Sequence, residues 1–519
     1  MSKAKILVKN TFWIYLNKLV TELLQVVVTI LIIRKLSVDD FGSFNFLVAN
    51  VMIFSLCGTS AVCTVFNRYI PELFEKKAKR ELIALINYGA LVSVGVVGTI
   101  CVLFYIFKSP LSDFLHMKAM ETYAMMFVVY LMFSLLNSLM NSVLASLLLH
   151  KILAHVNITK SLLRTLAYLI SIPWLSLETM LFIEIGSVII TLTAGIIVYL
   201  WYKAKVIDKF DGEENINFQW RRTVRLGLFS SANEIGAGVV GKMSDYYIIS
   251  AMSNAYFTGL YSFAFRIFNM TQQALPMKDF LSVLRPVFFQ KFTQVHKKDD
   301  FIQVYNFIVK FMLAVYCLPV LYIWLFGKPV INIIFDPKYI DAYIITCVIM
   351  FSNIIIAIFY PVGLTMLLIE KMEYALYSKI VVVFSIVGGI LAMKYYGILG
   401  VVLVTAIGDL LKNTIMFLLV RRKAPIVYRF GEYRNLLLSF IILFCLFYVP
   451  AAQIENIYSL IGISAAFGVC YVVMLFFFHP YNAPDLVSLE KLADTNTLTR
   501  SLKPCLISLY SWKVKALGH

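Results

Sequence analysis

Charged side chains occur inside several of the long apolar runs of this 519-residue chain. An ionisable group within a membrane-spanning segment costs about 2.5–3.5 kcal/mol on insertion scales, so it requires a partner, a wet cavity or a functional role. The basic candidates for a binding site are Lys18, Arg164, Lys242, Arg266 and Lys412. The acidic candidates are Glu22, Glu234, Asp245 and Asp409.

These residue types support two kinds of chemistry. Buried cationic groups bind phosphates or acidic sugars through charge-assisted hydrogen bonds, and arginine also forms the bidentate arrangement. A desolvated carboxylate can load and release a proton, so each of the four acidic residues is a candidate for a coupling proton or cation. A structural interpretation stays open beside these, in which the cations neutralise carboxylates, Glu184 among them, in ion pairs. Lys310 is expected instead to extend to the membrane interface.

The spacing of these residues predicts helices that place them on shared faces. In the first apolar run, polar residues recur at three- and four-residue steps, as one helix face requires. They are Thr11, Tyr15, Lys18, Glu22, Gln25 and Thr29. Similar steps connect Asp245 with Glu234, Arg266 with Ser262, and Asp409 with Thr405.

Composition indicates that the elements carrying these residues span a membrane. The chain is 61% hydrophobic and 14% charged, with a mean hydropathy of +0.82, which excludes a water-soluble globule. Runs of about twenty apolar residues predict fourteen spans. They lie near 10–33, 44–66, 82–107, 122–149, 156–175, 179–202, 224–251, 257–284, 303–326, 340–369, 374–393, 398–420, 435–452 and 457–478.

Charge placement predicts the orientation. With the N-terminus inside, the inner segments hold 33 basic residues and the outer segments hold 7. This asymmetry predicts that both termini are cytoplasmic in a multi-pass protein of the cell membrane. The net charge of +17 therefore indicates contact with membrane lipids rather than nucleic acid.

A weak internal repeat divides the chain. The pattern Ile32-Ile33 to Phe41-Gly42 recurs at Ile248-Ile249 to Phe257-Thr258-Gly259 with one inserted residue. Two halves of six spans each give a parallel repeat around a central cavity. The predicted parts are an N-terminal bundle (1–202), a cytoplasmic linker (203–222), a C-terminal bundle (223–423), two additional helices (424–478) and a cytoplasmic tail (479–519).

The stretch Asn10 to Phe46 resembles the opening of the polysaccharide transporter branch, the Wzx-type oligosaccharide flippases, of the multidrug/oligosaccharidyl-lipid/polysaccharide exporter superfamily. Three further segments resemble the same branch: Asn67 to Pro71, Asp245 to Arg266, and Phe335 to Ala342. The resemblance implies an all-α polytopic fold of two six-helix bundles. It also implies movement of an oligosaccharide on undecaprenyl pyrophosphate from the inner to the outer leaflet by alternating access, alongside a glycan polymerase and glycosyltransferases.

Two other functions stay open at this stage. A multidrug or small-molecule cation-coupled antiporter would share the fold, although a drug cation would favour a cavity dominated by carboxylates. A membrane enzyme would need a large outer loop or a paired-carboxylate site, and the sequence contains neither. We predict a transporter with no catalytic residue, no metal site and no cofactor, since the cysteines have no metal-ligand spacing and no GxxxxGK[ST] loop occurs.

Overall fold

A computed structural model describes residues 20–210, 221, 223–225, 227–228, 243–275, 298–369, 371 and 373–477. In these ranges all regular structure is helical, with no strand. Nine helices within them are long and apolar enough to cross a membrane. The predicted all-α polytopic membrane fold is therefore confirmed.

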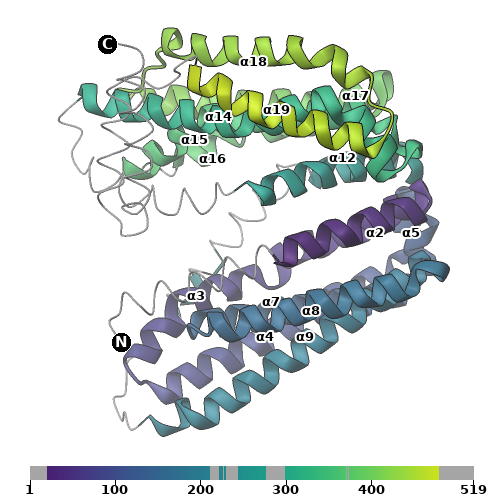
Figure 1. The fold of residues 1–519 in the computed structure, drawn as a ribbon. Coiled ribbons are helices and arrows are strands. Elements are labelled where there is room, and N and C mark those ends of the chain that lie inside the picture. Colours follow the sequence, from purple (N-terminus) through teal and green to yellow (C-terminus); the bar gives the residue numbers. More distant parts are fainter. Residues whose placement is uncertain are drawn as a thin grey trace. The chain divides into compact units, whose positions relative to one another are not determined.

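The described residues form two compact units. The first unit holds the described chain up to Arg266 together with Ser385–Thr405, and the second holds Ile267–Phe384 and the chain from Ala406 onward. Each unit is described separately below, and Figure 1 shows the helices by label.

The first unit begins with a helix over residues 20–35. It continues through α2 (Val38–Gly58), α3 (Ser60–Glu75), α4 (Lys79–Ile106), α5 (Lys108–Phe114), α6 (Lys118–Thr122), α7 (Ala124–Ser146), α8 (His150–Ser171), η1 (Ile172–Trp174), α9 (Leu177–Lys205), η2 (Ile207–Lys209), α11 (Met243–Met252) and the first turns of α12 (Ala255–Ala274). Apolar side chains of α3, α4 and α7, including Phe66, Leu82 and Leu144, form a buried core. Other apolar residues of α4, such as Leu91 and Ile106, are exposed, as expected for a surface that faces lipid.

The second unit contains the rest of α12, α14 (Lys298–Val330), η3 (Ile331–Phe335), η4 (Pro337–Tyr339), α15 (Ala342–Leu368), α16 (Glu373–Ser378), α18 (Phe430–Ala452) and α19 (Ile457–Phe477). The two last helices pack against α14 through aromatic rings. The Phe467 ring lies 5.4 Å from Phe326 and 5.3 Å from Phe447, and the Tyr322 and Ser464 hydroxyls are 3.0 Å apart. The two helices in the predicted range 424–478 therefore pack within this unit.

Helix α17 (Val381–Arg421) contains the later part of the predicted span 374–393, whose first residues belong to α16, and all of the predicted span 398–420, with Gly397 between them. Gly397 has a φ of +61°, which glycine adopts without steric cost. A Cβ atom on Gly400 would lie 2.7 Å from the carbonyl oxygen of Ala392, a residue that would be about 12 Å away along a straight helix. The chain therefore folds back on itself at Gly397, as the sequence predicts.

Other predicted boundaries differ from the structure. The span predicted at 44–66 straddles two helices, because α2 ends at Gly58 and α3 begins at Ser60. Helix α8 begins at His150 rather than near residue 156. Lys160 lies within both the predicted span and α8, although the 33 basic residues counted above as inner include it. The predicted spans 10–33, 224–251 and 257–284 lie partly outside the described residues.

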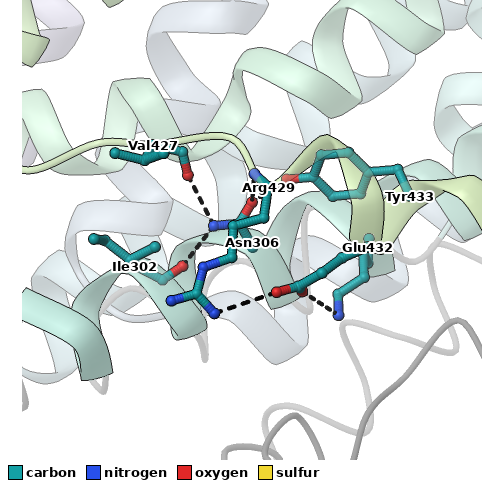
Figure 2. A network of polar contacts seen from close by, with 7 residues as sticks. Ile302, Asn306, Val427, Arg429, Glu432 and Tyr433 are labelled. Carbon is teal, nitrogen blue, oxygen red and sulfur yellow. Dashed lines mark hydrogen bonds and ion pairs between the residues drawn. The ribbon is translucent and has the colours of Figure 1, made fainter.

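A polar network anchors the segment between α17 and α18 to α14 in the second unit (Figure 2). The Asn306 amide donates to the carbonyl oxygens of Ile302 (2.7 Å) and Val427 (2.9 Å). Its oxygen accepts from the Arg429 backbone amide (3.0 Å) and from the Tyr433 hydroxyl. The network therefore satisfies backbone groups of a non-helical connection, which are costly to bury without hydrogen-bond partners.

Two tyrosines extend this anchor. The Tyr305 hydroxyl donates to Tyr428 (2.9 Å), whose hydroxyl donates to the carbonyl oxygen of Ile358 (3.1 Å). Burial raises the pKa of Tyr428 to about 12, so its phenol stays protonated at neutral pH. The connection is thus also attached to α15.

Lys310 belongs to the same region, and the expectation that it extends to the membrane interface is wrong. Its side chain is 0% exposed, and its ammonium nitrogen lies 2.9 Å from Oε2 of Glu432. The other Glu432 oxygen lies 3.3 Å from Nη1 of Arg429, a side chain that is 45% exposed. One carboxylate therefore pairs with a buried cation and with an exposed one.

This arrangement predicts unequal effects from two substitutions. Glu432→Gln deprives the buried Lys310 ammonium of its carboxylate and should cost about 3 kcal/mol of stability. Arg429→Gln removes the exposed partner of the same carboxylate and should cost less than about 1 kcal/mol. The measurement is the thermal unfolding midpoint of each purified variant, and equal midpoints for both would contradict the assignment. The double variant Lys310→Met/Glu432→Gln should recover part of the loss.

Candidate functional site

The structure describes six of the nine predicted site residues. Lys18, Lys242 and Glu234 lie outside the described residues. Of the six, Glu22, Arg164, Asp245 and Arg266 belong to the first unit, whereas Asp409 and Lys412 belong to the second.

Arg164 of α8 forms an ion pair with Glu184 of α9. Its Nη2 and Nε atoms lie 2.6 Å and 2.8 Å from Oε1 of Glu184. The Tyr168 hydroxyl donates to the same oxygen at 2.8 Å, and the Arg164 guanidinium lies over the Tyr168 ring. The carboxylate is 8% exposed and the guanidinium side chain 21% exposed. The structural interpretation of the membrane charges therefore describes this pair. Two of the five N–H donors of Arg164 serve Glu184, and the other three are not used by this carboxylate.

Arg266 of α12 is held differently. Its Nε and Nη2 atoms donate to the Thr29 hydroxyl at 3.2 Å and 2.8 Å. Thr29 lies on the helix over residues 20–35 and is 2% exposed. Within the part of the chain that the structure describes, Arg266 forms no ion pair. A neutral hydroxyl orients this guanidinium but leaves its charge available to an anion.

The charges on these helices lie close enough to interact. Arg266 is within electrostatic range of both members of the Arg164–Glu184 pair and of Glu22. The structure therefore brings together three of the predicted site residues, Glu22, Arg164 and Arg266, from separate helices. Two of these helices come from the first half of the repeat and one from the second.

Lys160 joins this cluster, and the sequence interpretation missed it. It lies in α8, four residues before Arg164, and interacts electrostatically with Arg164 and Glu184. The signal in the sequence was the four-residue step, which puts both cations on one helix face. We call Lys160, Arg164 and Arg266, with Glu184 and Glu22, the cationic cluster.

Asp245 forms a separate polar site in the first unit. Its side chain, 2% exposed, accepts from the Thr405 hydroxyl (2.7 Å) and the Tyr261 hydroxyl (3.1 Å). These partners come from α17 and α12, so the carboxylate links three helices. A buried carboxylate held by hydroxyl donors is compatible with either protonation state, because a hydroxyl both donates and accepts.

Asp409 and Lys412 pair with each other along α17. The Lys412 ammonium lies 2.7 Å from Oδ1 of Asp409, at a spacing of three residues. The two side chains are 29% and 26% exposed. Such a local pair lowers the cost of placing both charges in a span without tying either to another helix.

The described residues contain no group of three His, Cys, Asp or Glu side chains that could hold a metal ion. What the cationic cluster offers chemically is anion recognition: two guanidiniums and an ammonium with nearby tyrosine hydroxyls. Guanidinium groups favour phosphate and carboxylate oxygens through paired N–H donors.

The two arginines should differ in their effect on stability. Glu184→Gln breaks a buried ion pair and should lower stability by about 3 kcal/mol. Arg266→Gln removes a half-buried cation that has no carboxylate partner among the described residues, so stability should stay the same or rise. Thermal unfolding midpoints of the two purified variants test this, and a large loss for Arg266→Gln would show that Arg266 is a structural residue.

Comparison with solved structures identifies the fold. A structure described as "Lipid II flippase MurJ, inward closed conformation" has a TM-score of 0.68 and 13% sequence identity, covering 91% of this chain and 99% of that chain. A "multidrug resistance MATE family transporter of the MOP superfamily", in an inward-facing conformation, has a TM-score of 0.57 and 14% identity, covering 78% and 94%. At such identities the likeness shows a shared fold.

No curated protein matches the sequence. Residues 7–292, more than half of the chain, match the family described as "Polysaccharide biosynthesis protein". On this match the chain, an all-helical membrane protein with the fold of these two transporters, belongs to the polysaccharide biosynthesis protein family.

Proposed function

We propose that this protein is a flippase that moves a polyprenyl-pyrophosphate-linked oligosaccharide, a repeat unit of a surface polysaccharide, from the inner to the outer leaflet. The observation that carries this proposal is Arg266, a half-buried guanidinium oriented by Thr29 and without an ion pair among the described residues. A pyrophosphate supplies the anionic oxygens that such a group binds. Membership of the polysaccharide biosynthesis protein family and the fold shared with a lipid II flippase also support a flippase function.

The proposal gives each charged group a role. The cationic cluster, with Lys18, Lys242 and Lys412 as further candidates, binds the pyrophosphate or acidic sugars. Glu22, Glu234, Asp245 and Asp409 are the candidates for a coupling proton or cation. The protein acts as a transporter rather than an enzyme, and requires no cofactor.

Its setting follows from the charge asymmetry of the sequence. We place the protein in the cell membrane with both termini cytoplasmic, with bundles over 1–202 and 223–423 joined by the linker 203–222. The helices in 424–478 and the tail 479–519 complete the chain. Glycosyltransferases supply the lipid-linked substrate on the inner side, and a glycan polymerase uses it on the outer side.

The central experiment measures the sidedness of polyprenyl-linked oligosaccharide in cells depleted of this protein, with an impermeant probe that reaches only the outer leaflet. We expect the lipid-linked oligosaccharide to accumulate on the inner leaflet and re-expression to relieve this. Unchanged sidedness would contradict the flippase assignment.

Arg266 variants connect that phenotype to the site. Arg266→Gln should reduce delivery to the outer leaflet by at least about tenfold, because a charge-assisted contact to the substrate is lost. Arg266→Lys should restore part of it, since lysine keeps the charge but not the paired donors. The matched control is Thr29→Val, which removes the hydroxyl partner but keeps the cation and should change delivery by less than about threefold. Wild-type delivery by Arg266→Gln would exclude the anion-binding role.

The alternative is a multidrug or small-molecule cation-coupled antiporter, which the fold of the MATE transporter also fits. The excess of cations over carboxylates in the cationic cluster argues against a cationic drug. Drug resistance on overexpression, without any change in glycan export, would favour this alternative.

A further inference from the structure

A cavity of about 590 Å³ lies within the first unit, between the start of α4 and the chain that follows α9. Its volume is within the range of small-molecule binding sites, roughly 300–1,000 Å³. The cavity is polar at one side and apolar at the other, and its lining consists of Lys79, Arg80, Ile83, Ala84, Asn87, Tyr88 and Phe210. The proposed transport function uses none of these residues.

The wall of the cavity opposite α4 is Phe210, which neighbouring residues hold in place. The Phe74 ring packs against the Phe210 ring at 5.3 Å and stacks on the Tyr202 ring of α9 at 6.2 Å. The turn η2 is attached to α4, because the Lys79 ammonium donates to the carbonyl oxygen of Asp208 (2.9 Å) and lies 3.4 Å from its carboxylate. The cavity is therefore built by contacts within one unit.

The two cations of the cavity differ in their partners. Lys79 is paired with Asp208, so its role is to position the wall. Arg80 is exposed and forms no ion pair with any acidic residue that the structure describes. Glu81 belongs to the same first turn of α4 but does not line the cavity. Arg80 therefore carries the positive charge that the cavity presents to a ligand.

The polar side of the cavity suits a phosphate group. A guanidinium binds two phosphate oxygens through parallel N–H donors. Asn87 follows Arg80 by seven residues, which places it on the same face of α4 and adds two amide donors. A phosphate bound here would lie between a cation and a neutral donor.

The apolar side of the cavity continues into the lipid-facing surface of α4. Ala84, Tyr88 and Leu91 follow Arg80 at three- and four-residue steps, so they share its face. Tyr88 is 59% exposed and Leu91 is 69% exposed. Exposed tyrosines are typical of the membrane–water interface. Arg80 and Leu91 are separated by roughly 16 Å along the helix, so one helix face changes from a phosphate-binding group to a lipid-facing surface.

This combination distinguishes a phospholipid from a soluble anion. A soluble anion would use only Arg80 and Asn87, whereas a phospholipid joins a phosphate to acyl chains that require an apolar surface. The segment Arg68 to Arg80 holds five basic residues and lies on the inner side in the proposed orientation. Anionic lipids of the cytoplasmic leaflet attract such segments.

Resting on the orientation given with the proposed function, we propose that this cavity binds an anionic phospholipid of the inner leaflet. Arg80 and Asn87 bind its phosphate, and its acyl chains lie along the exposed face of α4 beyond Tyr88. Lys79 is a positioning residue that holds η2 and Phe210 against the ligand. The bound lipid thus joins α4 to the chain that follows α9.

The test measures lipid binding to the purified full-length protein in an uncharged detergent, by native mass spectrometry. The probes are dioleoyl phosphatidylglycerol and dioleoyl phosphatidylcholine. We expect the anionic lipid to bind at least about fivefold more tightly, and Arg80→Gln to raise its apparent Kd about tenfold. Arg80→Lys should raise it about threefold, since lysine keeps the charge but not the paired donors. Equal binding of the two lipids to the wild-type protein would overturn the proposal.

Arg68→Gln is the matched control, because it removes the same charge from the same inner segment. Arg68 does not line the cavity; its side chain is 62% exposed and its guanidinium lies 3.4 Å from Glu72. Its substitution should change the apparent Kd by less than about twofold. Equal losses in Arg68→Gln and Arg80→Gln would show a diffuse attraction to the basic surface and would overturn the site.

A second variant fills the cavity without changing any charge. Ala84→Trp places an indole between Arg80 and Phe210 and should raise the apparent Kd about tenfold. Unfolding midpoints measured without lipid confirm that each variant is folded. Unchanged binding by a folded Ala84→Trp variant would show that the lipid binds elsewhere.

Two competing occupants are tested with the same measurement. Inorganic phosphate at millimolar concentration should leave the bound lipid unchanged within about twofold, because it lacks the apolar contacts. Displacement of the lipid by phosphate would assign the cavity to a soluble anion. Glu213→Gln/Glu214→Gln, which neutralises carboxylates that follow Phe210 in the sequence, should change the Kd by less than about threefold. A tenfold gain would show that the chain's own carboxylates occupy the cavity and would overturn the lipid assignment.

Lipid binding is measured without glycan or transport, so its result is separate from that of the proposed function. Arg80-dependent binding together with unchanged glycan sidedness on depletion would support this site and contradict the flippase assignment. Loss of the lipid preference with the expected glycan accumulation would overturn this site alone.

Discussion

The cost of placing charge inside a membrane is the constraint on which the rest of this structure depends. An ion leaves water only if other groups replace its hydration, and the protein does this in three ways. Arg164 pairs with Glu184 from a neighbouring helix, and Asp409 and Lys412 pair along one helix. Among the residues that the structure describes, Arg266 forms no ion pair and donates to the Thr29 hydroxyl. These solutions stabilise the charge to very different degrees.

How fully a charge is neutralised by its partners indicates whether it contributes to stability or to function. A compensated charge holds helices together, as Lys310 and Glu432 do where they attach α18 to α14. An incompletely compensated charge lowers stability and is retained only if something else binds it. The Arg164–Glu184 pair interacts electrostatically with Arg266, but Glu184 forms its ion pair with Arg164 and not with Arg266. The cationic cluster thus contains one arginine in an ion pair and, among the described residues, one arginine without one.

The sequence was sufficient for the membrane fold because apolar run length has one physical cause, the thickness of the bilayer. It predicted a break between residues 393 and 398, around Lys394, and the chain turns there at Gly397 within α17. It could not predict the partners of Lys310, because the attachment to Glu432 crosses 122 residues and depends on tertiary packing. Lys160 was missed for a simpler reason: it was counted with the inner basic residues, although the predicted span 156–175 contains both Lys160 and Arg164 at a four-residue step. Arg164 meets the carboxylate oxygen of Glu184, whereas Arg266 meets the hydroxyl oxygen of Thr29. These partners come from other helices, so no local sequence pattern predicts them.

The repeat shows how a weak sequence signal acquires physical meaning. Two glycines separated by 217 positions are unremarkable in apolar segments, where small residues are common. In the structure a Cβ atom on Gly42 of α2 would overlap the carbonyl oxygen of Ala255, and one on Gly259 of α12 would overlap that of Val38. Each glycine is therefore required by the helix start that contains the other. Such a contact requires a glycine on both helices, because a methyl group on one helix would overlap the backbone of the other. The two helix starts therefore meet through equivalent surfaces, as in a contact around a two-fold axis.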